Sequence, residues 1–285
     1  MNKKVFMLRM MQLCPDRVFN TMIFLMKLKY LPHFKKPRSL NEKINFIKLY
    51  SQNKLRETVA DRIKVRSYVV DKNTGCDIIK LLWEGKNLDI DSYQNLPTKF
   101  VVKANHGSGM VKIINKNTTS YKELKSEINQ WLEYDYGKLT RQWVYKNLEK
   151  KFIVEEFIEF GGEDLPDYKF FCFNGKVNLI QVDLDRFNGH KRNLYDKNFN
   201  LLDVRYIYEN GEKIPKPELL DKAIHIAERL SEDFDFIRVD LYILNNKIYF
   251  GEMTNTPENG MGSFYPKSYD FYLGSKIKFN KELAE

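Results

Sequence analysis

Residues 236–262 read FIRVDLYILNNKIYFGEMTNTPENGMG, and this stretch decides the fold that we expect for the chain. From Ile237 to Ile243 apolar side chains alternate with polar ones, and a second β-rich run follows over residues 248–253. Asn245 and Asn246 lie between the two runs, and asparagine is common in tight turns because it tolerates positive φ. The pattern predicts an antiparallel β-hairpin.

The register of this hairpin decides which side chains share a face of the sheet. A two-residue loop would place Asp240 opposite Gly251, so that its side chain points away from Glu252. A three-residue loop centred on Asn246, or an equivalent bulge, would pair Asp240 with Glu252 instead. We expect the second arrangement, with the two carboxylates converging on one face.

Two carboxylates that face each other repel unless a cation lies between them. A hard divalent ion bound by oxygen atoms, which also holds a polyphosphate, is the usual solution. The same register would bring Arg238 and Thr254 to that face. The hairpin therefore predicts a Mg²⁺ site, and the alternative is a solvent-facing hairpin with ordinary surface charges.

The chain has 285 residues, of which 43% are hydrophobic, 14% aromatic and 30% charged, as in folded proteins with a full-sized core. No apolar run approaches the roughly 20 residues that cross a bilayer, and Arg9 interrupts the apolar N-terminal stretch, so we expect a cytoplasmic protein without a signal peptide. The three cysteines lack CxxC spacing and the four histidines lack zinc-like spacing, so we expect neither disulfides nor zinc.

The net charge of +9 is concentrated at the N-terminus. Eight lysines and arginines against one aspartate give the first 36 residues a charge of +7, and the remainder carries about +2. Such a basic, Met-containing leader is suited to peripheral contact with an anionic membrane face. The alternative is a pair of helices with a solvated basic face. We expect no nucleic-acid partner.

The pattern along the chain suggests three units, covering residues 1–54, 55–158 and 159–285. The first is basic and helical and ends in a helix that begins at the capping box Ser39–Glu42. A further helix is expected over residues 55–70, a hairpin around Asn174 and Gly175, and a helix over 218–233. Gly161 and Gly162 are typical of a hinge between lobes.

A glycine loop lies between two predicted strands, over residues 106–109. Gly107 and Gly109 allow the backbone to approach a phosphate closely, and Lys103 at the end of the preceding strand can add a positive charge. Lys169, in the first strand of the next hairpin, needs an anionic partner if it is buried. A basic loop contains Arg186, His190 and Arg192. It suits a lid over an anion, so these three residues are candidate contacts for a substrate or a phosphate.

Several motifs occur together in order: PRSLNEKINFIKLY, ADRIKVRSYV, FVVKANHGSGM, FIVEEFI, DYKFFCFNGKV and FIRVDLY…GEMTNTPENGMG. This set resembles the TupA-like ATP-grasp family of surface-polysaccharide gene clusters, over roughly residues 37–275. The resemblance implies an α+β fold in which two lobes with antiparallel sheets grip ATP, preceded by a helical N-terminal segment. The lobe with the glycine loop would be residues 55–158, and the lobe with the metal site 159–285.

The resemblance also implies the roles of individual residues. ATP would be bound by Lys103, His106, Gly107, Ser108, Gly109, Glu155, Glu156, Phe157, Ile158 and Glu163. Mg²⁺ would be bound by Asp240, Glu252 and Thr254, and Arg238 and Lys169 would act in catalysis. The chain departs from the family at two points: Asn255 lies one place beyond the usual asparagine ligand, which leaves the third ligand open between Thr254 and Asn255, and Arg62 stands where lysine is expected.

The activity that the resemblance implies is ligation of a carboxylate to an amine at the expense of ATP, through an acyl-phosphate intermediate. In polysaccharide biosynthesis the acid could be a uronic acid of an acidic glycan and the amine an amino acid. Two alternatives remain open. A glycosyltransferase could bind a nucleotide sugar through an Asp-x-Asp motif, of which the chain has three copies, at residues 89–91, 183–185 and 233–235. A non-catalytic module at the membrane surface would explain the basic leader.

Overall fold

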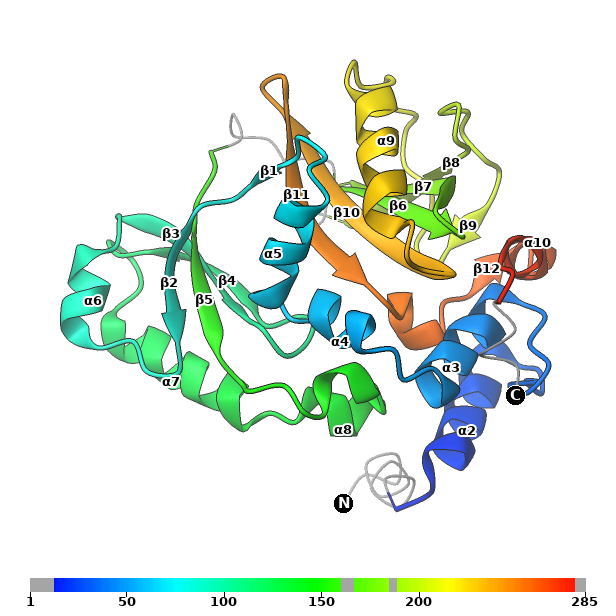
Figure 1. Cartoon of the computed structure of the whole chain (residues 1–285), viewed down its shortest axis with the longest axis horizontal. Helices are drawn as coiled ribbons and strands as arrows, with labels where there is room; N and C mark the ends of the chain where they lie inside the picture. Colours follow the sequence, from blue (N-terminus) through cyan, green and yellow to red (C-terminus); the bar gives the residue numbers. More distant parts are fainter. Residues whose placement is uncertain (1–12, 160–166, 185–188, 280–285) are drawn as a thin grey trace.

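The computed structural model describes residues 13–159, 167–184 and 189–279, and it has an α+β fold with three antiparallel or mainly antiparallel sheets (Figure 1). Glu163 and Arg186, the hinge glycines and part of the basic leader lie outside these residues. Among the described helices, none has the length and apolar character that a membrane span requires.

The larger sheet has six strands in the order β1-β11-β10-β6-β7-β8. All neighbours in it are antiparallel except β1 and β11. The strands are β1 (Asp77–Ile78), β6 (Asp167–Phe173), β7 (Lys176–Leu184), β8 (Lys191–Tyr195), β10 (Phe236–Leu244) and β11 (Lys247–Thr254).

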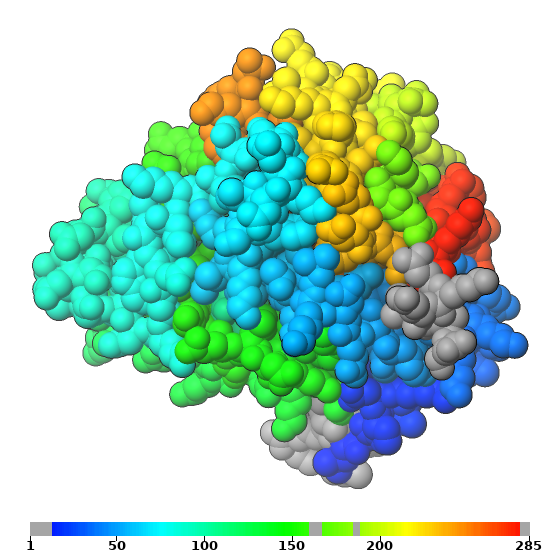
Figure 2. All heavy atoms as spheres, in the orientation of Figure 1, coloured from blue at the N-terminus to red at the C-terminus, as the bar shows by residue number. Residues whose placement is uncertain are grey.

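A smaller sheet has four strands in the order β2-β5-β3-β4, and a third sheet contains only β12 and β9. Figure 2 shows the part of the chain around the smaller sheet projecting from one side of the molecule. The strands are β2 (Leu81–Gly85), β3 (Lys99–Ala104), β4 (Val111–Asn115), β5 (Phe152–Glu156), β9 (Arg205–Tyr206) and β12 (Phe264–Tyr265).

The helices cover the sheets and fill the N-terminal part of the described chain (Figure 1). They are α2 (Asp16–Leu28), α3 (Leu40–Tyr50), α4 (Lys54–Ala60), α5 (Lys64–Asp71), α6 (Ile90–Asn95), α7 (Tyr121–Glu133), α8 (Tyr136–Thr140), α9 (Leu220–Ser231) and α10 (Ser268–Lys276). Two 3₁₀ turns are η1 (Trp143–Tyr145) and η2 (Pro257–Gly260).

Local signals in the sequence explain several of these boundaries. The capping box at Ser39 is formed as expected, because the Ser39 side chain accepts from the Glu42 amide and the Glu42 carboxylate accepts from the Ser39 amide. Asn174 and Gly175 adopt positive φ, of 48° and 74°, and close the predicted β6–β7 hairpin. The helix expected near residue 218 begins at Leu220 and packs its apolar stripe on the larger sheet.

The single helix expected over residues 55–70 is wrong, because α4 ends at Ala60 and α5 begins at Lys64. The break is held by Asp61, whose Oδ1 accepts from the Ile63 amide at 2.9 Å and from the Asn105 side chain at 3.2 Å. A buried aspartate that binds local backbone competes with helix continuation. Because of this turn, Arg62 lies between the two helices and its side chain points toward β3 and β11.

The packing of α4 and α5 groups residues differently from the sequence. Val59, Val65 and Tyr68 lie in the core between the larger sheet and α9, and β1 pairs with β11 of that sheet. Residues 54–78 thus pack with the larger sheet, although the sequence grouped them with the glycine loop. The second face of the same sheet packs on α3 and α10 through a separate core that includes Leu40, Phe171 and Phe236.

Candidate active site

Asp240 and Glu252 face each other on β10 and β11, as the sequence predicted. The route to this register is a bulge and not a three-residue loop. The turn has two residues, because Leu244 pairs with Lys247, and both asparagines have positive φ. The register then shifts by one residue between Asp240 and Leu241, which is the alternative that the sequence left open.

Gly251 is the residue that makes this bulge possible. A Cβ built on it would lie 2.9 Å from the backbone oxygen of Asp240 and 3.1 Å from the Tyr242 ring. Any side chain there would push the two strands apart where they must lie closest. The glycine therefore permits the shift that brings the two carboxylates to one face.

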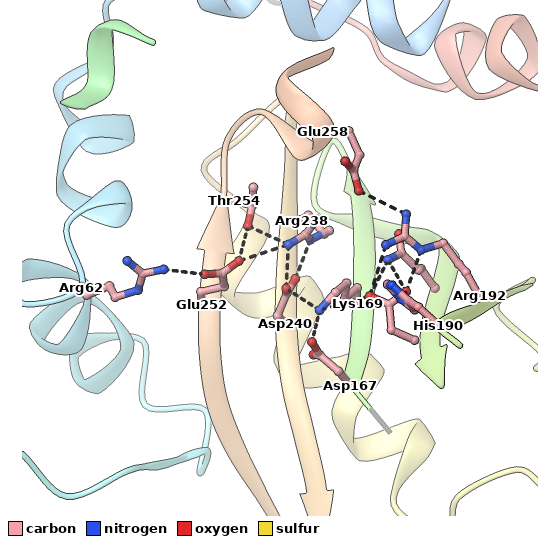
Figure 3. A network of polar contacts seen from close by, with 12 residues as sticks. Arg62, Asp167, Lys169, His190, Arg192, Arg238, Asp240, Glu252, Thr254 and Glu258 are labelled. Atoms are coloured by element: carbon pink, nitrogen blue, oxygen red, sulfur yellow. Dashed lines mark hydrogen bonds and ion pairs between the residues drawn. The ribbon is translucent and has the colours of Figure 1, made fainter. Parts of the chain in front are cut away.

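Arg238 lies between the groups that the sequence assigned to a metal (Figure 3). Its Nε donates to Asp240 Oδ1 at 2.7 Å, and its Nη2 donates to Asp240 Oδ2 at 2.7 Å, Glu252 Oε1 at 3.1 Å and Thr254 Oγ1 at 3.1 Å. The Thr254 hydroxyl donates to the same Glu252 oxygen at 3.0 Å. The guanidinium therefore relieves the repulsion between the two carboxylates within the protein itself.

Lys169 lies on the next strand, where β6 pairs Lys169 with Asp240. Its Nζ donates to Asp240 Oδ2 at 3.1 Å, contacts Asp167 and lies 3.9 Å from Asp183 Oδ2. The lysine side chain is 7% exposed, so it has the anionic partners that a buried lysine needs. Burial alone would lower the pKa of Lys169, but the charges of Asp240 and Asp167 outweigh it and raise that pKa.

The two facing carboxylates differ in exposure. The Asp240 side chain is 4% exposed, and burial raises its pKa against the lowering effect of Arg238 and Lys169. The Glu252 side chain is 35% exposed. Burial acts to raise its pKa too, but the charges of Arg62 and Arg238 outweigh it and lower the pKa to about 2. Glu252 is therefore the ionised, accessible oxygen donor of the pair.

Charged side chains continue on both sides of this pair in a series that alternates in sign (Figure 3). On one side the Arg62 Nη2 lies 3.3 Å from Glu252 Oε2. On the other, Arg192 Nε donates to Asp183 Oδ1 at 2.6 Å, and Arg192 Nη1 donates to Glu258 Oε1 at 3.1 Å. The series that we call the charge chain contains Arg62, Glu252, Arg238, Asp240, Lys169, Asp167, Asp183, Arg192 and Glu258.

Strand register explains why the charge chain lies on one face. Tyr242, Asp167, Asp183 and Arg192 form one cross-strand row, and Asp240 and Lys169 belong to the row beside it. Side chains two residues apart on a strand point to the same face, so the two rows converge. Sequence reasoning missed Asp167 and Glu258 as site residues and used Asp183 only as part of a generic motif. Asp167 could have been identified from its position two residues before Lys169, which places both side chains on one face of the strand.

The glycine loop connects β3 to β4 and contacts the charge chain through Arg62. Arg62 Nη1 donates to the backbone oxygens of Ala104 and Gly107, the second at 2.6 Å. Ser108 and Gly109 are exposed, and Gly109 has a φ of 81°. Their backbone is therefore free to approach an anion.

The His106 side chain faces the interior and not the loop surface, which corrects its expected place among ligand-binding side chains. The residue is 1% exposed, and its ring nitrogens lie 2.9 Å from the Trp131 backbone oxygen and 3.2 Å from Asn105 Oδ1. Burial is the main cause that lowers the pKa of His106. The histidine therefore anchors the loop on α7.

Lys103 and Glu155 lie opposite the charge chain, on β3 and β5. The Lys103 Nζ lies 2.6 Å from Glu155 Oε2, and Arg66 Nη1 donates to Glu155 Oε1 at 2.9 Å. The Glu155 side chain is thus neutralised by two cations. Beyond it, a cavity of about 390 Å³ opens where β5 ends near β1 and β11, lined by residues 77–80 and 156–158, Lys247 and Tyr249.

This cavity includes Glu156, Phe157 and Ile158, which the family resemblance placed among the ATP-binding residues. Ile78, Ile79 and Tyr249 supply apolar walls on the other side, and Lys80 and Lys247 supply charge.

Residues 42–278 match the sequence profile of the family described as TupA-like ATPgrasp, which covers most of the chain. The chain belongs to the TupA-like ATP-grasp family. No curated protein matches it significantly. The fold is thus that of a member of the ATP-grasp superfamily.

Solved structures similar to this family member share little sequence with it. A D-alanine–D-alanine ligase from Bacillus anthracis complexed with ATP has 16% identity and a TM-score of 0.42, covering 70% of this chain and 54% of that one. The corresponding ligase from Helicobacter pylori has 17% identity and a TM-score of 0.44, covering 77% and 61%. N5-carboxyaminoimidazole synthetase from Staphylococcus aureus complexed with ADP has 14% identity and a TM-score of 0.41, and the match covers 70% of this chain and 45% of that one. This chain thus spans about half to three fifths of their lengths.

Within this family member, Thr254 and not Asn255 lies beside the carboxylate pair. Asn255 Oδ1 accepts from Arg56 Nη1 at 3.1 Å, and its Nδ2 donates to the Arg56 backbone oxygen at 2.9 Å. Asn255 is 4% exposed and fastens β11 to α4. The donor set that faces the site, two carboxylates and a hydroxyl, consists of the oxygen ligands that Mg²⁺ prefers, and Glu252 gives it access from solvent. Among the described residues, no group of three or more His, Cys, Asp or Glu side chains is placed to hold a metal ion.

Proposed function

We propose that this protein is an ATP-dependent carboxylate–amine ligase that acts in bacterial surface polysaccharide biosynthesis. The observation that carries the proposal is the charge chain, in which Arg238 and Lys169 lie on the Asp240–Glu252 pair and Arg62 joins Glu252 to the glycine loop. Cations and oxygen ligands on one face are what transfer of a phosphoryl group to a carboxylate requires.

The two ends of ATP would be held by different elements. Phe157 and Ile158 would contact the base in the cavity, together with the backbone of Glu155 and Glu156. Lys103 and the backbone amides of residues 107–109 would bind the phosphates. Mg²⁺, when bound through Glu252, Asp240 and Thr254, would neutralise charge between phosphate oxygens. Glu163 remains a proposed ribose contact, and His106 contributes to this site by fixing the loop.

Arg238 and Lys169 would act on the transferring group. The carboxylate oxygen of the acid attacks the γ-phosphorus, the bond to the β-phosphate oxygen breaks, and ADP leaves. Arg238 would contribute positive charge beside the acyl phosphate, while its Nε and Nη2 stay bound to Asp240, Glu252 and Thr254. Lys169 supplies a second buried positive charge on the same side. The amine then attacks the acyl carbon and phosphate leaves, which forms the amide.

The acid would be an acidic glycan, with a uronic acid as the reacting group. The amine would be an amino acid or another primary amine. His190 and Arg186 remain proposed contacts for such anionic substrates. Arg192 is 4% exposed and binds Asp183 and Glu258. It would therefore hold these two carboxylates in position and not contact the substrate itself.

The glycosyltransferase alternative has no support from its three Asp-x-Asp motifs. Asp89 caps α6 by accepting from the Ser92 amide at 2.7 Å. Asp233 lies 2.6 Å from the Lys72 Nζ. Asp183 is buried in its pair with Arg192. Each first aspartate has a local partner that holds it in the fold.

A peripheral contact with the inner membrane face is also proposed. Val18, Leu25 and Met26 on α2 and Leu31 beyond it are 39 to 62% exposed, and Arg17, Lys27 and Lys29 flank them. Apolar side chains bordered by cations suit the surface of an anionic bilayer. Sedimentation with vesicles that contain anionic lipid tests this contact, and equal sedimentation with neutral vesicles would argue against it.

The central test is phosphate release from ATP over a panel of uronic-acid glycans and amino acids. We expect release that depends on both an acid and an amine, and Asp240→Asn should slow it by several orders of magnitude. Because Asp240 is buried between Arg238 and Lys169, this change should also lower stability, so the folded fraction of the variant is measured together with its activity. Wild-type protein that ignores ATP but transfers a sugar from a nucleotide sugar would overturn the proposal.

A further inference from the structure

Glu258 lies at the end of the charge chain and differs from its other carboxylates. Asp167, Asp183 and Asp240 have side chains at most 5% exposed. Glu252 is accessible but binds Arg62, Arg238 and Thr254. Glu258 is 34% exposed, and within the described residues its ion pair is the one from Arg192 to Oε1. Its other oxygen is therefore available to a ligand.

The backbone that carries Glu258 is strained. Glu258, Asn259 and Gly260 have φ values of 50°, 56° and 67°, which places three consecutive residues in the left-handed region. For a residue with a side chain this conformation persists only where surrounding structure enforces it. The loop is therefore held in a shape that an unconstrained chain would leave.

Three side chains of α3 enforce this shape. Asn41 Nδ2 donates to the Gly262 backbone oxygen at 2.7 Å, Asn45 Nδ2 to the Gly260 oxygen at 2.8 Å, and Lys48 Nζ to the Asn259 oxygen at 3.1 Å. The three residues are spaced four and three apart, so they lie on one face of the helix. All three are buried, at most 3% exposed.

Arg192 fixes the Glu258 side chain in the same way. Its guanidinium is held by Asp183 and lies over the rings of Tyr206 and Tyr208, 5.3 and 4.7 Å from their centroids. It binds one oxygen of Glu258 and leaves the other (Figure 3). Figure 3 shows Glu258, Arg192 and Arg238 in the same network of polar contacts, so this carboxylate belongs to the region of the proposed reaction centre.

The charge of Glu258 indicates what it would bind. Asp167, Asp183 and Asp240 are buried against Lys169, Arg192 and Arg238, and the His190 ring nitrogen lies 3.3 Å from Asp183. Glu258 is the carboxylate at the exposed end beyond Arg192. A preorganised carboxylate with one free oxygen favours a hydrogen-bonding cation.

We propose that Glu258 binds the ammonium group of the amine substrate beside the site of acyl-phosphate formation, an inference that rests on the proposed function. Glu258 first takes one proton from the ammonium and passes it to water, which frees the nitrogen lone pair. This lone pair forms the bond to the acyl carbon as the bond from that carbon to the phosphate oxygen breaks, and the second proton that the nitrogen loses leaves with phosphate. The substrate class is a primary amine that is protonated in solution, such as an amino acid.

Hydroxylamine separates this role from every earlier step. It is mostly uncharged near neutral pH, and it traps an acyl phosphate as a hydroxamate without needing a site for an ammonium group. The assay contains the full-length protein, Mg-ATP and glucuronic acid oligosaccharides, with either hydroxylamine or a mixture of the twenty amino acids as the nucleophile.

We expect Glu258→Gln to raise the amino-acid concentration for half-maximal rate by about tenfold or more, as loss of one charge-assisted hydrogen bond implies. Hydroxamate formation should stay within about twofold of wild type. Glu258→Asn should raise the same amino-acid concentration, and asparagine tolerates the left-handed backbone at this position. Agreement between the two variants would show that the weaker amine binding comes from the lost charge and not from a change of the fold. Glu209→Gln, an exposed glutamate paired with Arg205, is the matched control and should change neither rate.

Two other outcomes would overturn the assignment. If Glu258→Gln lowers hydroxamate formation and amide formation equally, Glu258 serves the acid or the loop and not the amine. If its amino-acid dependence equals that of wild type, the amine binds elsewhere. A wild-type protein that forms neither hydroxamate nor amide would instead refute the ligase function itself, together with the inference built on it.

Discussion

Lys48 places an ammonium group in the interior of the protein, where it is 3% exposed and donates to the backbone and side-chain oxygens of Asn259. Burial lowers its pKa from 10.5 to about 7, against a small opposing effect from Asp16. A lysine can lose its proton in this position and still donate hydrogen bonds, so the clamp on the 258–260 turn does not need the charge.

This residue predicts a particular dependence of stability on pH. Between about pH 7 and 10 the folded protein holds Lys48 neutral, whereas the unfolded chain keeps it protonated. Because the unfolded state binds more protons, this lysine makes the free energy of unfolding rise with pH in that window, by roughly 1 kcal/mol per pH unit, while below pH 7 its cost is constant. Urea unfolding of wild type and Lys48→Met at pH 7, 8 and 9 should show a flatter curve for the variant, and parallel curves would contradict the assignment.

The residue scale also shows where prediction from sequence reached its limit. The sequence predicted that Asp240 and Glu252 face each other, with a bulge as one of two routes, and it placed Arg238 on the same face. It did not predict that Arg238 bridges the two carboxylates, because this depends on how the guanidinium reaches back over Asp240 on its own strand. The inward orientation of the His106 side chain could not be predicted either, since nothing in its own segment indicates that α7 supplies its hydrogen-bond partner.

At the scale of elements, the β10–β11 hairpin depends on agreement between a turn and a bulge. The two asparagines form a two-residue turn that by itself would turn Asp240 away from Glu252. One extra residue on β11 reverses that outcome. Sequence patterns specify turns through residues with positive φ, whereas this bulge depends on contact between Gly251 and the Asp240 backbone, which appears only after the strands pair.

Gly251→Ala tests this element. Its methyl group would meet the Asp240 backbone oxygen at 2.9 Å, which neither strand can relieve without moving one of the two facing carboxylates. We expect activity to fall about a hundredfold and stability by about 1–3 kcal/mol, as for other overpacked sites. Gly75→Ala is the control, because Gly75 has a φ of 71° but a Cβ added there would meet no heavy atom within 4 Å. This variant should lose stability through its backbone and retain activity. Full activity in Gly251→Ala would show that the bulge does not set the carboxylate pair.

At the scale of the whole molecule, Arg62 joins the two main sheets. It lies in the break between α4 and α5 and is 14% exposed. One nitrogen binds the backbone of the glycine loop after β3 and the other binds Glu252 on β11. The family resemblance expected a basic residue at position 62, but periodicity could not predict the break in the helix that directs Arg62 toward the strands, because Asp61 ends α4 through a contact with distant Asn105.

This connection predicts how the glycine loop responds to nucleotide. With Arg62 in place, the Gly107 carbonyl is tied to the carboxylate strand, while exposed Ser108 and Gly109 can open. Mg-ATP should order residues 106–110 over its phosphates and slow their amide hydrogen exchange in wild type. Arg62→Met should exchange faster than wild type in the same segment without nucleotide, because the tie to Glu252 is lost. Lys64→Met, an exposed lysine two residues away, should exchange as wild type does. If the loop keeps the same protection with and without saturating Mg-ATP, then the glycine loop does not bind the phosphates, and the two sheets do not close on ATP in the way that Arg62 implies.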